Sequence, residues 1–169
     1  IDFCLSQDSA ILHLISGDYW GVNRITPGVL RQQEEFEGTP VVYRGADDLP
    51  FETLDGFVVS ENYGPVREFI EREGLRLTCA VTNATSMDVM PEGVNKWRGT
   101  AYVAAREGIA YENIVAAGNY YNDLELIRGA GVGVAVRNAP EEVRAQADYV
   151  TARTHLEDAV AEIVEKFIL

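Results

Sequence analysis

The pattern of apolar and polar residues changes near residue 90. Before it, apolar runs alternate with turn residues, and they predict strands over Ala10–Ile15, Val41–Tyr43, Leu54–Ser60, Leu75–Asn83 and Ser86–Met90. The last two strands are expected to form an antiparallel hairpin. Two helices are predicted between the strands, opened by Pro27 and Pro65. Strands with helices on one face predict an α+β domain over residues 1–90.

Beyond residue 90 helices and strands alternate regularly. Helices are predicted over 94–107, from 123, from 139 and at the C-terminus, with strands over 114–117, 132–136 and 149–150. This alternation is typical of a parallel sheet covered by helices. The last helix is expected to begin with a capping box of Thr154 and Glu157 and to face the sheet with Leu156, Val160, Ile163, Val164 and Phe167. Three short strands are too few for a usual open sheet, so residues 91–169 are expected to form part of one.

Oxygen-bearing side chains collect where strand 114–117 ends. Asn119, Asn122 and Asp123 follow it directly, and open α/β sheets bind ligands at the carboxyl ends of their strands. Oxygen ligands of this kind suit a hard cation such as Mg²⁺. Asp123 has an alternative structural role as the cap of a short helix over residues 124–128, and the two roles can coexist.

Two further polar residues stand out. Lys96 falls in the first turn of helix 94–107, where a cation is unfavourable by about 0.3–1 kcal/mol, so it is expected either to point into water or to face an anion. Asn138 precedes Ala139-Pro140-Glu141, which is the pattern of a helix cap.

The net charge and the composition limit the classes of molecule that the chain is expected to bind. The net charge of −13 argues against nucleic acids and anionic membranes, which the average field repels. No apolar run approaches the roughly 18 residues of a membrane span, and no signal peptide is evident, so a cytoplasmic location is expected. Cys4 and Cys79 are interpreted as core residues, and neither His13 nor His155 has a neighbour that suggests a metal site.

Three segments together resemble the C-terminal half of a Cof-type phosphatase of the haloacid dehalogenase (HAD) superfamily. They are Met90–Lys96, Gly118–Asp123 and Val134–Ala139, and the resemblance is strong over residues 86–169. It implies a Rossmann-like parallel core, of which residues 91–169 are the C-terminal half, and an inserted α+β cap domain over residues 1–90. It also implies hydrolysis of phosphate monoesters with Mg²⁺ through an aspartyl-phosphate.

The same resemblance assigns roles to the candidate residues. Lys96 matches the catalytic lysine that neutralises the phosphate and the nucleophile. Asn119 and Asp123 match the metal positions, and Asn122 and Asn138 match phosphate- or substrate-binding positions. Phosphoryl transfer requires mainly positioning and charge neutralisation, which a metal ion and a lysine supply together.

The chain departs from the family pattern at two places. Asn119 stands where the family has an aspartate, so weaker magnesium binding is expected. The nucleophile motif Asp-x-Asp is absent, and Asp2-Phe3-Cys4 does not replace it because Cys4 stands where the second aspartate belongs. We expect the nucleophile segment to have been removed, or to be disordered, or to be supplied by another polypeptide. Self-association as a homodimer, or a partner chain that supplies the missing strands, is expected to cover the exposed sheet.

The sequence therefore predicts a magnesium-dependent phosphomonoester hydrolase for a small, sugar-phosphate-type substrate, inactive as this chain alone. The alternative is a non-catalytic HAD-like binding or assembly protein that has lost the nucleophile and one metal carboxylate.

Overall fold

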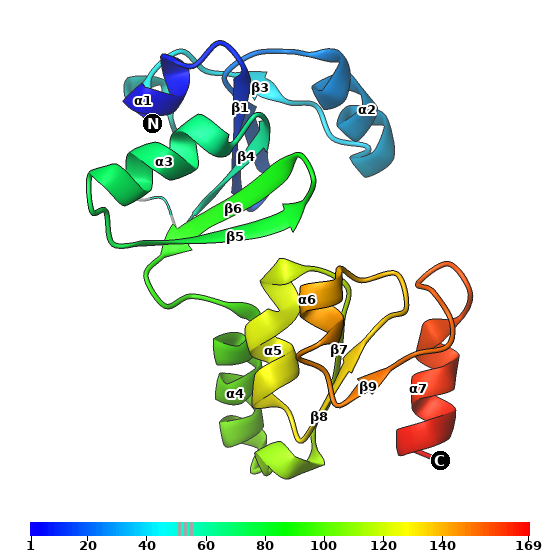
Figure 1. Cartoon of the computed structure of the whole chain (residues 1–169). Coiled ribbons are helices and arrows are strands. Elements are labelled where there is room, and N and C mark those ends of the chain that lie inside the picture. Colours follow the sequence, from blue (N-terminus) through cyan, green and yellow to red (C-terminus); the bar gives the residue numbers. More distant parts are fainter. Residues whose placement is uncertain (51, 53, 55) are drawn as a thin grey trace. The chain divides into compact units, whose positions relative to one another are not determined.

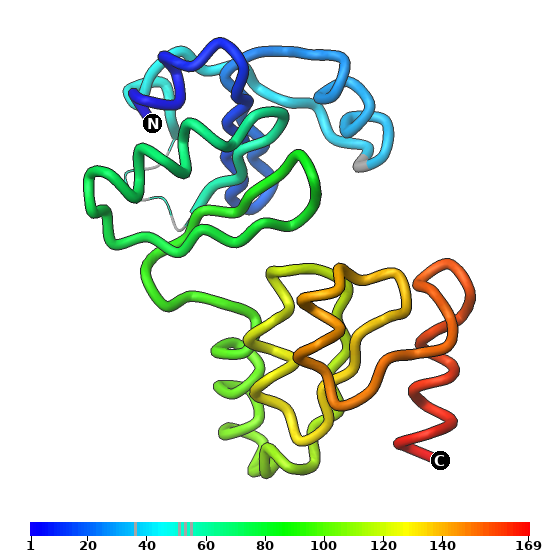
Figure 2. Tube along the Cα trace, in the orientation of Figure 1, coloured from blue at the N-terminus to red at the C-terminus, as the bar shows by residue number. Residues whose placement is uncertain are grey.

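A computed structural model describes residues 1–50, 52, 54 and 56–169, which form two compact units (Figure 1). Unit 1 covers Ile1–Glu92 and unit 2 covers Gly93–Leu169. The trace in Figure 2 follows the chain from one unit into the other at this point. The division falls two residues beyond the boundary at residue 90 that the sequence predicts. Among the helices of the described residues, none has the length and apolarity that crossing a membrane requires.

Unit 1 is built on a six-stranded sheet with the order β3-β2-β1-β4-β6-β5. Its strands are β1 (Ala10–Ser16), β2 (Tyr19–Val22), β3 (Val41–Val42), β4 (Phe57–Glu61), β5 (Leu77–Asn83) and β6 (Ser86–Pro91). All neighbours are antiparallel except β2 and β3, which are parallel. The predicted hairpin of β5 and β6 is confirmed, with Asn83 paired to Ser86. The predicted strand over Leu54–Ser60 includes residue 55, which lies outside the described residues.

Helices lie on both faces of this sheet. They are α1 (Asp2–Leu5), α2 (Pro27–Phe36) and α3 (Gly64–Arg72), with a 3₁₀ turn η1 (Ala46–Asp48). Leu12 and Leu14 of β1 belong to the main core, together with Cys4 of α1 and Val66 and Ile70 of α3. The intervening Ile11 packs instead with Val29 of α2. Since successive strand residues point to opposite faces, α2 lies on the face opposite α1 and α3.

The prediction of helices on one face is therefore wrong for α2. This helix connects the parallel neighbours β2 and β3, and the handedness of such a crossover fixes the face that its helix covers. Its start is as predicted: Thr26 is the N-cap and its hydroxyl oxygen accepts the Val29 N–H at 3.3 Å. Asp2 lies in helix α1 and not in a strand, so the segment Asp2–Cys4 does not have the strand that a nucleophile motif requires.

Unit 2 contains a three-stranded parallel sheet with the order β7-β8-β9. Its strands are β7 (Val115–Gly118), β8 (Val132–Ala135) and β9 (Tyr149–Val150). The helices are α4 (Lys96–Glu107), α5 (Leu124–Gly129), α6 (Glu141–Arg144) and α7 (Ala159–Phe167), with 3₁₀ turns η2 (Tyr111–Asn113) and η3 (Tyr121–Asp123). The predicted fold class, α/β with an α+β unit followed by a parallel sheet, is confirmed.

The C-terminal helix differs from its prediction. Glu157 does accept hydrogen bonds from the N–H and hydroxyl of Thr154, but these bonds close a turn before the helix, whose N-cap is Asp158. Leu156 and Val160 are 83% and 70% exposed, so they do not face the sheet. Ala159 and Ile163 are the buried residues of α7. A periodic apolar pattern identifies a helix but does not determine which part of it another element covers.

Candidate active site

The turn after β7 is built around the buried side chain of Asp123, which is 3% exposed. Its Oδ2 atom accepts the backbone N–H groups of Asn119 (2.8 Å) and Tyr120 (3.2 Å). Gly118 is the last residue of β7, and only a glycine leaves room there, because an added Cβ would lie 2.3 Å from the Cβ of Asp123. Asp123 is the N-cap residue of α5, as the alternative predicts, but its side chain forms no cap hydrogen bond to that helix. The carboxylate instead fixes the turn that precedes it.

Lys96 is the first residue of α4, behind Asn95, whose side-chain oxygen accepts the Arg98 N–H at 2.8 Å. The Lys96 Nζ donates a hydrogen bond to Oδ1 of Asp123 and forms an ion pair with it. The lysine side chain is 50% exposed. A cation is unfavourable at a helix N-terminus, and the Lys96 amine is paired there with the Asp123 carboxylate. Of the two predicted alternatives for Lys96, water or an anion, the structure shows the anion.

Packing of α4 against α5 holds this pair in place. The indole of Trp97 fills the space beside Gly129, where an added Cβ would lie 2.2 Å from the ring. The same indole meets the ring of Tyr111 edge to face, with centroids 5.0 Å apart. Trp97, which follows Lys96, therefore fixes the position of α4. The backbone of Lys96 is held in place with this helix.

Asn119 and Asn122 lie beside the ion pair on the same turn. Asn119 is exposed and Asn122 is partly buried. Within the part of the chain that the structure describes, no hydrogen bond involves either side-chain amide. Both amides are thus open to an external ligand, and the half-exposed side chain of Lys96 supplies a positive charge at the same turn.

These oxygen atoms fit a magnesium ion only in part. Mg²⁺ requires nearly octahedral oxygen ligation, usually with one or two carboxylates. Both oxygens of Asp123 already have partners, and Asn119 offers a neutral amide oxygen. Among the described residues, no three His, Cys, Asp or Glu side chains are grouped so as to hold a metal. Unit 2 offers one ligand position, and any carboxylate ligand must come from elsewhere.

Asn138 does not cap α6, and its side chain contacts the segment before α7. The N-cap of α6 is Pro140, with no side-chain cap, so the Asn-cap prediction is wrong. The Asn138 side chain instead pairs with His155, through Nδ2 and Nδ1 at 2.7 Å and through Oδ1 and the His155 N–H at 3.2 Å. It follows β8, whose carboxyl end lies at the same sheet edge as that of β7, so its assignment to the substrate site stays a prediction.

A second contact at this edge was not predicted. Arg137 Nη2 donates to Glu157 Oε2 at 2.7 Å and forms an ion pair with it. The backbone N–H and hydroxyl of Thr154, with Arg137, lower the pKa of the Glu157 carboxyl. The Thr154–Glu157 spacing was the only feature of the sequence that pointed to Glu157. It predicted a helix start and not a contact with Arg137. These bonds join the segment after β8 to the segment before α7.

Comparison with known proteins decides the family. The model of the haloacid dehalogenase-like hydrolase family matches residues 1–164. The chain belongs to this family.

Curated relatives of this HAD-like chain include phosphatases. It is 36% identical over 98 residues to the 5-amino-6-(5-phospho-D-ribitylamino)uracil phosphatase YcsE of Bacillus subtilis, which is 58% of this chain and 39% of that protein. It is 39% identical over 85 residues to the stress response protein YhaX of the same organism, covering 50% of this chain and 29% of the relative. A phosphoglycolate phosphatase of Methanothermobacter thermautotrophicus is 45% identical over 75 residues, 44% of this chain and 34% of the relative. The chain thus spans well under half of these relatives.

Solved structures agree in fold. A sugar phosphatase of HAD subclass IIB superposes with a TM-score of 0.82 at 21% identity, over 98% of this chain and 63% of that one. A haloacid dehalogenase-like hydrolase from Bacillus subtilis gives a TM-score of 0.82 at 17% identity, over 99% of this chain and 69% of that one. At these identities the likeness establishes the HAD fold.

Proposed function

We propose that the protein to which this chain belongs is a magnesium-dependent phosphomonoester hydrolase that works through an aspartyl-phosphate. The observation that carries the proposal is the ion pair of Lys96 with the buried Asp123 at the carboxyl end of β7. Had the lysine pointed away from this strand end, no phosphate site could be assembled there. Family membership and the phosphatases among the relatives support the same reaction class.

Each residue takes a role that its contacts support. Lys96 neutralises the non-bridging oxygens of the phosphoryl group and the attacking carboxylate. Asp123 is a positioning residue, because its two oxygens orient the Lys96 amine and the Asn119–Tyr120 turn. Asn122 donates its amide N–H to the phosphate. Asp123 was first assigned to the metal, and its occupied oxygens favour the positioning role.

The metal and the nucleophile complete the proposal. Asn119 contributes its amide oxygen to the magnesium ion, and the attacking carboxylate comes from residues outside this chain. When bound, the ion neutralises charge on the phosphoryl oxygens. Asn138 pairs with His155, and the substrate-binding role that the family resemblance implies is proposed for it.

The substrate class is proposed from the relatives. Two of them are phosphatases of a phosphoribitylaminouracil and of phosphoglycolate, according to their names. Both are small phosphorylated molecules, and one carries a sugar-alcohol phosphate. We propose a small, sugar-phosphate-type substrate for this protein as well.

Phosphate release by the protein from the complete reading frame tests the function. The proposal requires turnover of small phosphate monoesters that depends on added Mg²⁺ and is lost with EDTA. Residues 1–169 alone are expected to be inactive. Binding of inorganic phosphate without turnover by the complete protein would contradict hydrolysis.

That last result would favour the second candidate, a non-catalytic HAD-like binding or assembly protein. The observation in its favour is Asn119, which stands at the metal position without a charge. A site with weakened metal binding can still hold a phosphorylated ligand through Lys96.

Replacing Asn119 with aspartate is expected to raise the affinity for Mg²⁺ roughly tenfold, because a charged oxygen is added where the amide now stands. Calorimetric titration of the complete protein measures the change. Asn113→Asp is the matched control, since it adds the same charge at an exposed position in η2 and should leave magnesium binding unchanged. Equal affinities in Asn119→Asp and the parent protein would refute the metal assignment of this turn.

We also propose that another polypeptide segment covers the free edge of β7, either from a second copy in a homodimer or from a partner chain. Within the described residues β7 pairs only with β8. Beside this strand lies a hollow of about 660 Å³, lined largely by apolar residues that include Val103, Ile109, Ile114 and Leu126. An open strand edge beside apolar surface favours association. Sedimentation velocity of residues 1–169 should show dimers or larger species, and a monodisperse monomer would contradict this proposal.

A further inference from the structure

The loop after β8 is attached to the end of β7, where the proposed phosphate site lies. The Val136 N–H donates to the Gly118 carbonyl oxygen at 3.1 Å, and Gly118 directly precedes Asn119. Val136 and Ala139 are buried in the core of unit 2, whereas Asn138 between them is exposed. The backbone around Asn138 is therefore held at this sheet edge, and its side chain is accessible to a ligand.

His155 makes both hydrogen bonds that the Asn138 side chain forms with the described residues. Its backbone N–H donates to Asn138 Oδ1 at 3.2 Å, and its Nδ1 lies 2.7 Å from Asn138 Nδ2. A backbone N–H only donates, so the atom that it meets is the amide oxygen. An amide nitrogen also only donates, so Nδ1 accepts and the neutral imidazole carries its proton on Nε2. The two bonds together fix the orientation of the amide, which one bond would leave free to rotate.

This contact leaves one N–H of the Asn138 amide without a partner in the part of the chain that the structure describes. The Nδ2 atom carries two hydrogens, and His155 receives one of them. Because both bonds join the same two residues, they use the amide edge that carries the oxygen and the hydrogen beside it. The second hydrogen points away from that edge. An exposed N–H of fixed direction is a preorganised donor for a phosphoryl oxygen.

Arg137 and Glu157 form a second link between the same two segments. Arg137 Nη2 donates to Glu157 Oε2 at 2.7 Å, and this carboxylate also accepts the N–H and the hydroxyl of Thr154. The segment that carries His155 is thus held independently of the Asn138 bonds. Loss of the imidazole is expected to free the Asn138 amide while the second link keeps the two segments together.

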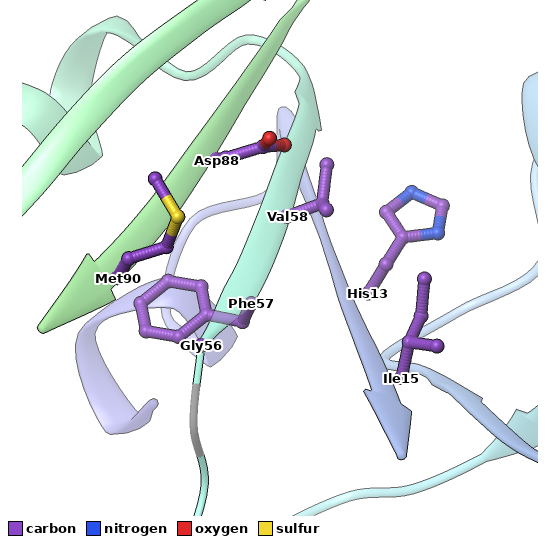
Figure 3. A pocket seen from close by; sticks show the side chains of 7 residues that line it. All are labelled: His13, Ile15, Gly56, Phe57, Val58, Asp88 and Met90. Atoms are coloured by element: carbon purple, nitrogen blue, oxygen red, sulfur yellow. The ribbon is translucent and has the colours of Figure 1, made fainter. Parts of the chain in front are cut away.

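The other histidine of the chain has its partners inside unit 1. His13 lies with Ile15 at a hollow of about 210 Å³ on the unit 1 sheet (Figure 3). Its Nε2 lies 2.7 Å from the Ser60 hydroxyl, and its Nδ1 accepts the Trp20 indole N–H at 3.2 Å. Both ring nitrogens of His13 are therefore used within unit 1, and His155 is the histidine at the end of the parallel sheet.

We propose that His155 is a positioning residue for phosphate binding, which holds the Asn138 amide so that its second N–H donates to a phosphoryl oxygen. The inference rests on the phosphate-binding function proposed for Lys96 and Asn122. His155 acts through Asn138 and does not touch the phosphate itself. An amide that is oriented before the ligand arrives loses less conformational freedom on binding, so the same hydrogen bond contributes more to affinity.

Calorimetric titration of the complete protein with inorganic phosphate, in the presence of Mg²⁺, tests the inference. His155→Leu removes the acceptor and should weaken phosphate binding about tenfold. His155→Asn should retain the parent affinity, because its Oδ1 atom accepts at the place of Nδ1. Glu157→Gln is the matched control, since it removes the charge from the second link between the same segments and should leave phosphate affinity unchanged.

A double-mutant cycle separates positioning from a general structural role. In an Asn138→Ala background, His155→Leu should not weaken phosphate binding further, because the group through which His155 acts is gone. The inference is overturned if His155→Leu weakens binding equally in both backgrounds, if it has the parent affinity, or if His155→Asn is as weak as His155→Leu. Should His155→Leu not fold, His155→Ala removes the same acceptor and takes its place in every comparison.

Failure of this inference differs from failure of the proposed function. A parent protein that binds phosphate without hydrolysing phosphate monoesters refutes hydrolysis, while the binding comparison decides the role of His155. A parent protein that hydrolyses monoesters, with unchanged phosphate affinity in His155→Leu, refutes the His155 inference alone. A parent protein that binds no phosphate in the presence of Mg²⁺ refutes both.

Discussion

Lys96→Met is expected to lower kcat for phosphate release by the complete protein about 10²–10³-fold, since it removes the cation that faces the phosphoryl group in the proposed site. The fold should survive. Asp123 keeps the two backbone N–H groups on Oδ2, and the Lys96 side chain is half exposed, so the expected cost in unfolding free energy is about 1–2 kcal/mol. Steady-state kinetics and thermal unfolding measure the two effects separately.

Lys166→Met is the matched control for this prediction, because Lys96 and Lys166 are the only lysines of the chain. Lys166 lies in the last turn of α7, where its amine is 4.7 Å from the centroid of the Tyr149 ring. Its replacement removes the same charge from unit 2 without touching the turn after β7. If Lys96→Met lowers turnover no more than Lys166→Met does, the assignment of Lys96 to the phosphate site is wrong.

Acidification from pH 6.5 to pH 4 is expected to cost unit 1 about 3 kcal/mol of unfolding free energy through His13 alone. The pKa of this residue is about 4 in the folded chain, against an ordinary value of 6.5. Well above pH 6.5 neither state is protonated, so His13 does not affect stability there. Between pH 6.5 and pH 4 the unfolded chain takes up a proton that the folded chain does not, so stability falls as pH falls.

His13→Gln should remove this part of the acid sensitivity while retaining groups that can bond Ser60 and Trp20. Urea unfolding at pH 7 and pH 4.5, followed by Trp20 fluorescence in a Trp97→Phe background, reports unit 1. The other histidine, His155, is exposed in unit 2, so His155→Gln should retain the full acid dependence of unit 1. The same pH dependence in the parent chain and in His13→Gln would show that carboxylates alone cause the acid loss.

The sequence predicts best those parts of the fold whose contacting segments are close together along the chain. Strands β7, β8 and β9 follow one another along the chain and pair in that order, so short apolar runs between helical patterns are enough to predict the parallel sheet. Lys96 and Asp123 lie 27 residues apart, yet they meet because a helix start and a strand end fall at the same edge. The family resemblance assigned both residues to one site, Lys96 to the phosphate and Asp123 to the metal, but it did not predict their ion pair.

Contacts between irregular segments could not be predicted. Asn138 pairs with His155 and Arg137 with Glu157, and none of these residues belongs to a periodic pattern that points to its partner. The motifs Asn-Ala-Pro-Glu and Thr-x-x-Glu each satisfy the spacing of a helix cap. In the structure the Asn138 side chain bonds His155, and Glu157 bonds Arg137 in addition to Thr154, because a cap motif fixes only the local option and tertiary neighbours compete for the same groups. The face occupied by α2 likewise depends on a crossover, which no single segment specifies.

The two sheets differ in how far apart their paired strands lie in sequence. In unit 2, Val115 pairs with Val132 and Val134 with Tyr149, whereas in unit 1 the central pair joins Ala10 to Glu61. Folding rates fall as contacting residues become more distant along the chain, since longer loops must close before any contact forms. In refolding from urea, the Trp97 signal should therefore recover before the Trp20 signal, and the Lys96–Asp123 pair should be in place while the larger sheet is still assembling.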